Sequence, residues 1–447
     1  MLGMNYRLRE LEERGLPIMT GIVGAGQMGR GLVVQMASMK GMRPAVVADV
    51  VMENAKAAFD CAGLSEGRDY DFAGTVEEGD KLLAEGKCVA SENSELATKC
   101  RAIYCVVDAT GAPEAGAKAA IDAINCKKHI VMLNVETDVC IGHILHKLAS
   151  NAGVVYTGSA GDEPAATIEL FDFADALGFD VRVIGKGKNN AVDYDCTPES
   201  VAEEAKGKGA SAKMICSFKD GTKTMVEMTA MANATGFLPD VMGAHGASGS
   251  VKDLPDLLSL KSEGRGGILN SYRTIEYVNG VAPGVFLIFA SDRPDVNHEL
   301  QYLKLGSGPN YALYRPYHLA SLETPLSVAK ACLDGMPTIV PRAGHVAETG
   351  TVAKRDLKAG ERLDGIGGFT VRGTFISSRD AEEKDVLPLG LVNKNTVMKR
   401  DVERGGLITY ADVDLDQSAL VLQLRRLQDA LFIKATALRR RASPMSF

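Results

Sequence analysis

The chain has 447 residues, 46% of them hydrophobic and 24% charged, with a formal net charge of −7. This length predicts two or three domains with ordinary cores. The negative charge balance lacks the basic footprint of proteins that bind nucleic acid or anionic membranes. The longest apolar runs, such as 284–290, are much shorter than the roughly 20 residues that span a bilayer. We therefore expect neither a nucleic-acid partner nor a membrane partner.

The compartment is indicated by the cysteines and by the first helix. Nine cysteines form no C-x-x-C pair, and Cys105 lies in a pattern typical of a buried strand. Such cysteines are typical of reduced core residues. Residues 6–14 form a charged amphipathic segment without the apolar core of a signal peptide. These features predict a cytoplasmic protein.

The first third of the chain alternates short apolar runs with helical stretches, as in a parallel sheet with crossover helices. We predict an α/β fold with an N-terminal Rossmann domain over residues 1–156. The expected strands are 20–23, 45–48, 102–107 and 130–133, and helices are expected to start near Arg30, Val51, Pro113 and Val139.

A G-x-G-x-x-G motif directly follows the first of these strands. Gly24 permits the tight turn, Gly26 lets a pyrophosphate approach the backbone, and Gly29 lets the next helix pack closely on the sheet. Asp49 ends the second strand, where a carboxylate can bind the ribose of a dinucleotide. We therefore predict a dinucleotide site that includes Gly24, Gly26, Gln27, Met28, Gly29 and Asp49.

Polar residues also follow the later strands of the predicted sheet. Asp108, Thr110 and Gly111 come after the third strand, and Asn134 follows the fourth. The carboxyl ends of parallel strands meet at one edge, so these residues are expected to line the same crevice and bind the cofactor. Asn134 has an alternative role, because asparagine also caps turns.

Beyond this region the strands are mixed with glycine-rich loops. Residues 157–340 are predicted to form an α+β catalytic and dimerisation domain. Its expected elements are strands at 179–184 and 214–218, a helix at 224–235, and a helix near 317–335 that packs back on the first domain. Residues 346–447 are predicted to form a small β domain that ends in a helix at 416–438.

A turn in the middle region carries adjacent carboxylates. Asp162 and Glu163 lie beside Gly161 and Pro164, and Glu169 follows one or two helical turns later. Magnesium and manganese prefer oxygen ligands of this kind. The simpler alternative is a helix start, in which Asp162 is the N-cap and Pro164 lies in the first turn.

Residues 185–190 follow a predicted strand and are expected to form a flexible loop. This loop carries two lysines. Lys188 is a candidate for polarising a carbonyl oxygen, although loop lysines are more often solvated. Lys213, Lys223 and Glu227 are further candidates. Lys223 and Glu227 are four residues apart, so the alternative for them is a surface pair on a helix.

A third polar group lies at 314–318. Arg315, Tyr317 and His318 precede a predicted helix and suit a phosphate or carboxylate, unless they form only a packed domain junction. His245 lies among glycines in a loop and is a weaker candidate for a direct role.

Together these segments resemble the homoserine dehydrogenase-like Rossmann proteins with a C-terminal SAF (β-clip) domain. Within that family they are similar to the 1-deoxyxylulose-5-phosphate reductoisomerase-like enzymes. The motifs that carry the resemblance are 134–138 (NVETD), 161–164 (GDEP), 187–190 (GKNN), 220–224 (DGTKT), 353–361 (AKRDLKAGE) and 387–391 (LPLGL).

The resemblance implies NADPH-dependent conversion of 1-deoxy-D-xylulose 5-phosphate to 2-C-methyl-D-erythritol 4-phosphate, in a homodimer. A divalent ion, Mg²⁺ or Mn²⁺, would promote the rearrangement before hydride transfer. On this reading Asp162, Glu163 and Glu169 hold the metal, and Lys188, Lys213, Glu163 and His318 are catalytic. The phosphorylated sugar would be bound by Ser159, Asn189, Arg315 and Tyr317.

Three alternatives stay open. Asp49 favours NADH over NADPH, because its charge repels a 2′-phosphate. A homoserine dehydrogenase, or a related dehydrogenase of small hydroxy acids or sugars, would need no rearrangement. A nucleotide-sensing binding protein would use the same fold without turnover.

Overall fold

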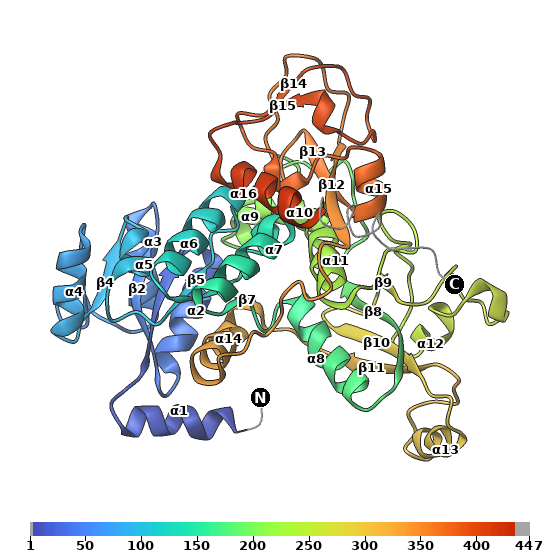
Figure 1. Ribbon diagram of the computed structural model, residues 1–447, viewed down its shortest axis with the longest axis horizontal. Helices are drawn as coiled ribbons and strands as arrows, with labels where there is room; N and C mark the ends of the chain where they lie inside the picture. The colour runs from blue at the N-terminus through green and yellow to red at the C-terminus, as the bar shows by residue number, and fades with distance from the viewer. Residues whose placement is uncertain (1–2, 434–447) are drawn as a thin grey trace, which may run out of the picture. The chain divides into compact units, whose positions relative to one another are not determined.

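The computed structural model describes residues 3–433, which form two compact units. The first unit comprises 3–158, 325–340 and 415–433, and the second comprises 159–324 and 341–414. Both are α/β in composition, and the predicted N-terminal Rossmann sheet is confirmed (Figure 1). Each unit is described here by itself.

The first unit alternates strands and helices along the chain. Its strands are β1 (Ile18–Val23), β2 (Met42–Ala48), β3 (Tyr70–Phe72), β4 (Cys88–Ser91), β5 (Cys105–Asp108), β6 (His129–Met132) and β7 (Tyr156–Gly158). Its helices are α1 (Met4–Glu13), α2 (Gln27–Ser38), α3 (Met52–Cys61), α4 (Val76–Ala84), α5 (Glu95–Lys99), α6 (Pro113–Asn125), α7 (Val135–Ala152), most of α14 (Ala320–Asp334), α16 (Leu420–Gln428) and the π-turn Asp429–Ile433.

The seven strands form one parallel sheet in the order β3-β4-β2-β1-β5-β6-β7. A core of buried residues joins the sheet to α1, α2, α3 and α14, with Leu32, Phe59 and Val328 among its members. The helix predicted near 317–335 contributes Val328 and Ala329 to this core. At the other end of the sequence, α16 packs on α6 and α7. Glu114 accepts hydrogen bonds from the first amides of α16, at Leu420 (2.8 Å) and Val421 (2.9 Å).

The second unit has more varied elements. Its strands are β8 (Asp180–Lys188), β9 (Thr274–Asn279), β10 (Val285–Ala290), β11 (Tyr311–Arg315), β12 (Ala347–Ala353), β13 (Val371–Ser377), β14 (Val397–Met398) and β15 (Val413–Asp414). Its helices are α8 (Glu163–Ala176), α9 (Ala202–Gly207), α10 (Ala212–Lys219), α11 (Thr222–Thr235), α12 (Leu254–Leu257), α13 (Pro294–Tyr302), the start of α14, α15 (Ser378–Glu383) and the 3₁₀ turns Lys261–Glu263, Leu389–Leu391 and Tyr410–Asp412.

A four-stranded sheet, β11-β10-β8-β9, organises this unit. Successive residues of a strand point to opposite faces, and both faces are covered. Ile184, Leu287 and Phe289 pack with α8 and α11, whereas Val183 and Phe286 pack under the segment that contains α12.

The C-terminal β region shares the core of the second unit. Ala347 of β12 and Phe375 of β13 belong to the same buried cluster as the methionines of α11. A buried ion pair between Lys354 and Asp220 (2.6 Å) adds to this attachment. Residues 341–414 are therefore part of the second unit, whereas the sequence predicted a separate domain over 346–447.

Two other sequence predictions differ from the structure. The strand predicted at 214–218 is wrong, because these residues lie inside α10, whose N-cap Ser211 accepts the Met214 amide (3.3 Å). The terminal helix predicted at 416–438 begins later, at Leu420, and its α-helical part ends at Gln428. Residues beyond 433 in that prediction lie outside the described residues.

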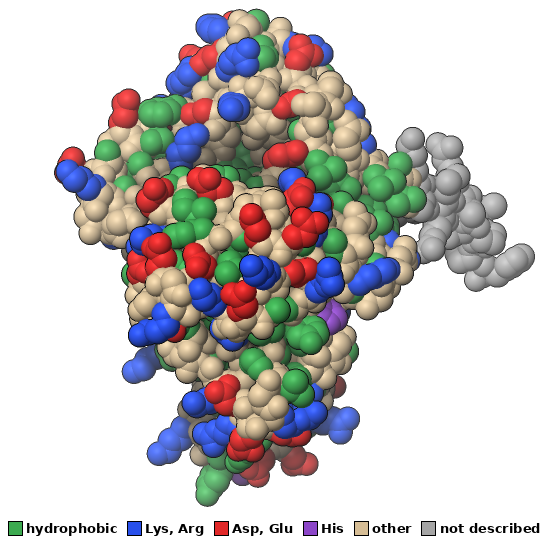
Figure 2. All heavy atoms as spheres, turned by 90° about the vertical axis from the view of Figure 1, so that its left-hand side faces the viewer, with side chains coloured by type: hydrophobic (Ala, Val, Ile, Leu, Met, Phe, Trp, Pro, Cys, Tyr) green, Lys and Arg blue, Asp and Glu red, His purple; other side chains and the backbone are tan. Residues whose placement is uncertain are grey.

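Across residues 3–433 no helix combines the length and the apolar character needed to span a bilayer. Figure 2 shows basic and acidic side chains interspersed on the face turned to the viewer, with no extended area of one sign.

Candidate active site

The glycine motif of the first unit forms a turn between β1 and α2. Gly24 has a φ of +95°, and a Cβ there would lie 2.8 Å from the Ala109 backbone. At Gly29 a Cβ would lie 2.0 Å from the Gly24 carbonyl oxygen. At Gly26, by contrast, a Cβ would meet nothing within 4 Å. The protein's own packing thus requires two of the glycines, and the third faces space that a ligand can fill.

Asp49 is fixed beside this turn. One carboxylate oxygen accepts the Ala25 amide (2.7 Å), and the other accepts the Val51 amide (2.9 Å) and the Asn54 side chain (3.2 Å). These donors hold the carboxylate at the carboxyl end of β2. Asp49 therefore places a fixed negative charge where the ribose of a dinucleotide binds in Rossmann folds.

A cavity of about 410 Å³ lies next to the same strand ends. It is bordered by the start of α3 and the carboxyl ends of β3 and β4, and the Asp49 amide bonds to the Ser91 carbonyl at its edge (3.0 Å). Among residues 3–433 its one charged lining residue is acidic, and the described lining is Met52, Phe72, Ala73, Gly74, Ser91, Glu92 and Asn93.

The predicted cofactor residues beyond β5 form a closed network. Asn134 caps α7 by accepting the Thr137 amide (3.1 Å), and its amide group donates to Asp108 (3.0 Å). Asp108 also accepts the hydroxyl of Thr110 (2.7 Å) and is fully buried. Burial raises the pKa of Asp108 to about 6. Asn134 is thus occupied as a helix cap, the alternative that the sequence left open, while Gly111 lies exposed.

In the second unit, the acidic turn is held against the start of α14. The Gly161 carbonyl accepts the Ala320 amide (2.9 Å) and the Nδ1–H of His318 (3.2 Å). Gly161 has a φ of +77°, and a Cβ there would lie 2.5 Å from the Cβ of Glu323. Ser159 completes the contact through its hydroxyl, 2.7 Å from that of Thr324. These contacts determine where the next two residues, the acidic pair, are placed.

Asp162 occupies the N-cap position of α8, yet its side chain accepts no capping hydrogen bond. One carboxylate oxygen, Oδ2, is buried and has no hydrogen-bond partner among the described residues. The alternative that Asp162 is the N-cap of a helix is therefore correct for its backbone. Its side-chain carboxylate is not used as a cap and stays available for chemistry.

Strand β8 places two lysines on one face. A Cβ at Gly185 would lie 2.0 Å from the Glu276 carbonyl oxygen, and one at Gly187 would lie 2.2 Å from the Ala282 nitrogen. Close neighbours thus exclude side chains from that face, and Lys186 and Lys188 project from the other. The flexible loop expected at 185–190 is wrong for residues 185–188, because these are buried in the strand.

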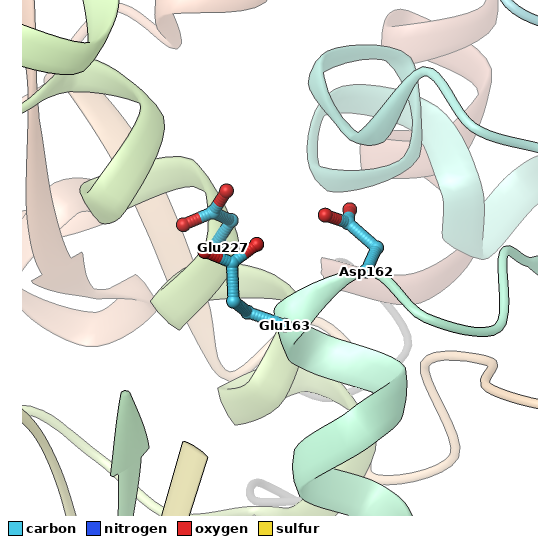
Figure 3. Close-up of side chains that lie close together, drawn as sticks. All are labelled: Asp162, Glu163 and Glu227. Carbon is cyan, nitrogen blue, oxygen red and sulfur yellow. The ribbon is translucent and has the colours of Figure 1, made fainter. Parts of the chain in front are cut away.

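Lys186 lies between two carboxylates. Its Nζ is 2.7 Å from Oε1 of Glu163 and contacts Oε2 of Glu227 on α11. Both Glu227 and the lysine side chain are buried, so the surface-pair alternative is wrong for Glu227. Asp162, Glu163 and Glu227 each offer an oxygen within 4.8 Å of the others. Figure 3 shows these three side chains at the start of α8 and on the facing helix. We call Lys186, Asp162, Glu163 and Glu227 the ammonium–carboxylate cluster.

The protonation states within the cluster differ. Burial raises the pKa of Asp162 to about 7, against the opposing charge of Lys223. Burial acts on Glu163 in the same direction, but the charges of Lys186 and His318 outweigh it and lower its pKa. The two glutamates outweigh burial at Lys186 and raise its pKa. Burial, together with the charge of Glu163, also raises the pKa of Glu227 to about 8. Near neutral pH the cluster therefore contains an ion pair, Lys186–Glu163, beside two carboxyls, Asp162 and Glu227, that exchange a proton.

The expected divalent ion fits this arrangement poorly. The Lys186 ammonium already donates to two of the three gathered carboxylates, and burial raises the pKa of the third, Asp162, to about 7. Glu169, the third expected ligand, lies elsewhere and pairs with Arg315 (3.4 Å). Lys186 thus supplies the positive charge that was expected from a divalent metal ion.

The 315–318 segment divides into two parts. Arg315 donates to Glu323 (2.6 Å), pairs with Glu169 and stacks over the ring of the half-exposed Tyr317, 4.6 Å from its centroid. Two carboxylates thus compensate Arg315, which weakens the expectation that it binds a phosphate. His318 instead joins the cluster, with its Nε2 3.3 Å from Oε1 of Glu163.

Other predicted site residues lie apart from these contacts. Lys188 donates to the Phe218 carbonyl (2.8 Å), and burial followed by the charge of Lys186 lowers its pKa. Asn189 is exposed just beyond β8. Lys213 is exposed on α10 and donates to the Asp364 carbonyl (3.0 Å). His245 pairs with the buried Asp240 through Nε2 (2.7 Å).

Comparison with protein families supports an enzymatic role for the second unit. Residues 161–324 match the model of a family described as "Oxidoreductase DRL, catalytic domain". This span begins at Gly161 and contains the whole ammonium–carboxylate cluster. No curated protein matches the sequence.

Solved structures of dehydrogenases are distantly similar. A probable dehydrogenase from Thermotoga maritima is 12% identical, with 73% of this chain and 92% of that chain covered and a TM-score of 0.42. A scyllo-inositol dehydrogenase from Lactobacillus casei, solved with NAD(H) and scyllo-inositol, is 13% identical, with coverages of 74% and 93% and a TM-score of 0.41. A myo-inositol dehydrogenase from Corynebacterium glutamicum is 14% identical, with coverages of 72% and 90% and a TM-score of 0.38. Likeness at this level says nothing about the substrate.

The glycine turn and fixed carboxylate of the first unit are features with which Rossmann folds bind a dinucleotide. The second unit matches an oxidoreductase catalytic domain and buries an ammonium among carboxylates. The chain is an NAD(P)-dependent oxidoreductase.

Proposed function

We propose that the protein is a dehydrogenase that interconverts a hydroxyl and a carbonyl group on a small polyhydroxylated substrate, at the ammonium–carboxylate cluster. The observation that supports this most is the pairing of unlike groups. Lys186 is held as a cation by two glutamates, and the adjacent Asp162 has an unpartnered buried oxygen and a pKa of about 7.

Each group suits one requirement of the reaction. A bound reduced nicotinamide supplies a hydride, with its electron pair, to the carbonyl carbon. The oxygen then gains negative charge, which the Lys186 ammonium stabilises without further rearrangement. Asp162 donates the proton that converts the alkoxide to a hydroxyl, and in the oxidative direction its carboxylate takes that proton back. A group with a pKa near neutrality suits this exchange in both directions.

For the cofactor we propose NADH rather than the NADPH expected from the resemblance. The Asp49 carboxylate is held in place by three donors, and Glu92 lines the neighbouring cavity. Neither the cavity lining nor the donors to Asp49 include a lysine or arginine to receive a 2′-phosphate. Two negative charges there disfavour the phosphorylated dinucleotide.

The experiment is a panel assay of the full chain in both directions, with NAD(H) and NADP(H). The panel contains inositols, homoserine, simple hydroxy acids and 1-deoxy-D-xylulose 5-phosphate, and turnover is followed by nicotinamide absorbance. We expect oxidation or reduction of a panel member that is lost in Asp162→Asn while the dinucleotide still binds. Full turnover in Asp162→Asn would contradict the proposal.

A reductoisomerase is the second candidate, favoured by the three carboxylate oxygens gathered within 4.8 Å. That reaction requires a cation that chelates two substrate oxygens, so Lys186 would have to leave the cluster. The carbon connectivity of a ¹³C-labelled product separates the candidates. A rearranged skeleton formed from deoxyxylulose phosphate would establish the second and displace the first.

Two family-based expectations stay proposals for which we offer tests. A homodimer would show twice the chain mass in solution. The SAF identity of residues 346–414 would be tested by an experimental structure of the full chain.

A further inference from the structure

Arg30 is a half-buried arginine whose side chain has no polar partner within residues 3–433. It is the fourth residue of α2, and its Nε is buried without a hydrogen-bond partner. Its side chain forms no ion pair in the same range, and the first turn of α2 contains no acidic residue. A guanidinium is always charged and carries five N–H donors, so burying part of it without an acceptor costs free energy. An unpaired cation of this kind suits an anionic ligand.

Other basic side chains around the same sheet are compensated. Lys56 on α3 pairs with Glu66 (2.7 Å), and two arginines of later loops likewise pair with carboxylates, at 2.8 Å and 3.1 Å. All three cations are exposed, so water could satisfy them, whereas Arg30 is half-buried. The unpaired state of Arg30 is therefore not the rule for this unit.

The position of Arg30 brings its charge to the glycine turn. The Arg30 amide donates to the Gly26 carbonyl (2.8 Å) and closes the first turn of α2. Long side chains on a helix point back toward its N-terminus, so the Arg30 side chain extends over this turn. Gly26 is the N-cap and offers no side-chain hydrogen bond to the amides that follow. These amides and the positive end of the helix dipole thus lie at the same end of α2 as the arginine.

The space beside Gly26 can hold the group that such donors suit. A Cβ at Gly26 would meet nothing within 4 Å, so no atom of Arg30 fills that space. In Rossmann folds the pyrophosphate of a dinucleotide binds at this turn, against the start of the helix. The pyrophosphate carries the negative charge that Arg30 lacks in the protein itself.

We infer that Arg30 binds the pyrophosphate of the dinucleotide through its guanidinium. The planar fork of an arginine can donate two parallel hydrogen bonds to phosphate oxygens, in addition to those from the backbone amides of α2. The inference needs the dinucleotide site but not the dehydrogenase reaction, so it goes beyond the proposed function.

The test is Arg30→Met in the full chain, with Arg9→Met as the matched control because Arg9 is exposed on α1. NADH is titrated by its fluorescence, and ADP and adenosine are measured by competition. We expect Arg30→Met to weaken NADH and ADP about 10- to 100-fold, as for a lost charge-assisted hydrogen bond, and to leave adenosine unchanged. Arg9→Met should change none of the three. Arg30→Lys should recover only part of the loss, because an ammonium lacks the fork.

Three results would overturn the inference. The first is unchanged binding of NADH and ADP by Arg30→Met, and the second is an equal loss for adenosine. The third is a loss confined to NADPH and 2′-AMP, which would assign Arg30 to a 2′-phosphate. The proposed dehydrogenase survives all three, because it depends on the substrate panel and on Asp162→Asn.

A second measurement uses the wild-type protein and so does not depend on the folding of a variant. Phenylglyoxal modifies arginine side chains, and peptide mapping by mass spectrometry reports the rate at Arg30. We expect ADP to protect Arg30 and adenosine to leave its rate unchanged. A rate at Arg30 that ADP does not lower, or that adenosine lowers equally, would also overturn the inference.

Discussion

The glycine turn of the first unit and the ammonium–carboxylate cluster of the second illustrate two ways of building a site. The turn consists of backbone, and its packing requires the absence of side chains at Gly24 and Gly29, whereas Gly26 leaves space for a ligand. The cluster consists of charged side chains from β8, α8 and α11 that are stable only together. A backbone site is therefore visible as a local motif, whereas a charged site depends on tertiary packing and on mutual compensation.

The largest expected effect tests that compensation. Lys186→Met removes the cation and leaves buried carboxylates without a partner, so we expect a loss of about 3–5 kcal/mol in the free energy of unfolding. Turnover should fall about 100- to 1,000-fold through loss of charge stabilisation. Urea unfolding and steady-state kinetics measure the two effects.

The matched control is Lys188→Met, two residues along the same strand. Lys188 donates only to a carbonyl in the contacts described above, so its replacement should cost less in both measurements. Equal losses in the two variants would mean that the cluster has no special role. A larger loss in Lys188→Met would indicate that Lys188, which the sequence predicted as catalytic, is the functional lysine.

The next largest effect concerns the backbone site. Gly26→Val projects into open space, so we expect native stability but loss of NADH binding in a fluorescence titration. Gly29→Ala instead meets the Gly24 carbonyl, and overpacking of this kind costs about 1–3 kcal/mol. If Gly26→Val bound NADH normally, the turn would not be the pyrophosphate site.

The pH dependence refines the role of Asp162. Its pKa is raised to about 7, so the acid form needed for carbonyl reduction is present below that pH and lost above it. We expect kcat/KM for reduction to fall as pH rises through 7, and kcat/KM for oxidation to rise over the same range. A kcat/KM that rises with pH for reduction and falls with pH for oxidation would exclude Asp162 as the group that exchanges the proton.

The smallest effect is on cofactor choice. Asp49→Asn removes the charge and keeps an oxygen that can accept the Ala25 amide. We expect the ratio of the NADPH and NADH dissociation constants to shift toward NADPH by about tenfold, or 1.4 kcal/mol. A wild-type protein that already prefers NADPH would contradict the proposed role of Asp49.

The sequence was most informative where local rules decide the structure. The strand–turn–helix frame around Gly24 and the helix that begins beside Asp162 follow from glycine, proline and apolar periodicity. The strand predicted at 214–218 was wrong because a short apolar run does not distinguish a strand from one buried face of a helix.

The cluster was only partly predictable. Asp162, Glu163 and His318 were expected as site residues, but Lys186 was read as part of a flexible loop and Glu227 as one member of a possible surface pair. Burial of a charge is not encoded within four residues, since it depends on which elements fold over it. One local signal existed for Lys186, because alternation with Gly185 and Gly187 is typical of a strand with one tightly packed face.

The central claim is that a lysine, and not a metal ion, provides the positive charge among Asp162, Glu163 and Glu227. Electron paramagnetic resonance of Mn²⁺ titrated into the full-length protein tests it directly, with Lys186→Met as the comparison. We predict that Mn²⁺ stays free with wild type and is bound by the variant, whose carboxylates have lost their cation. One tightly bound Mn²⁺ per wild-type chain, lost in Glu227→Gln, would contradict the claim.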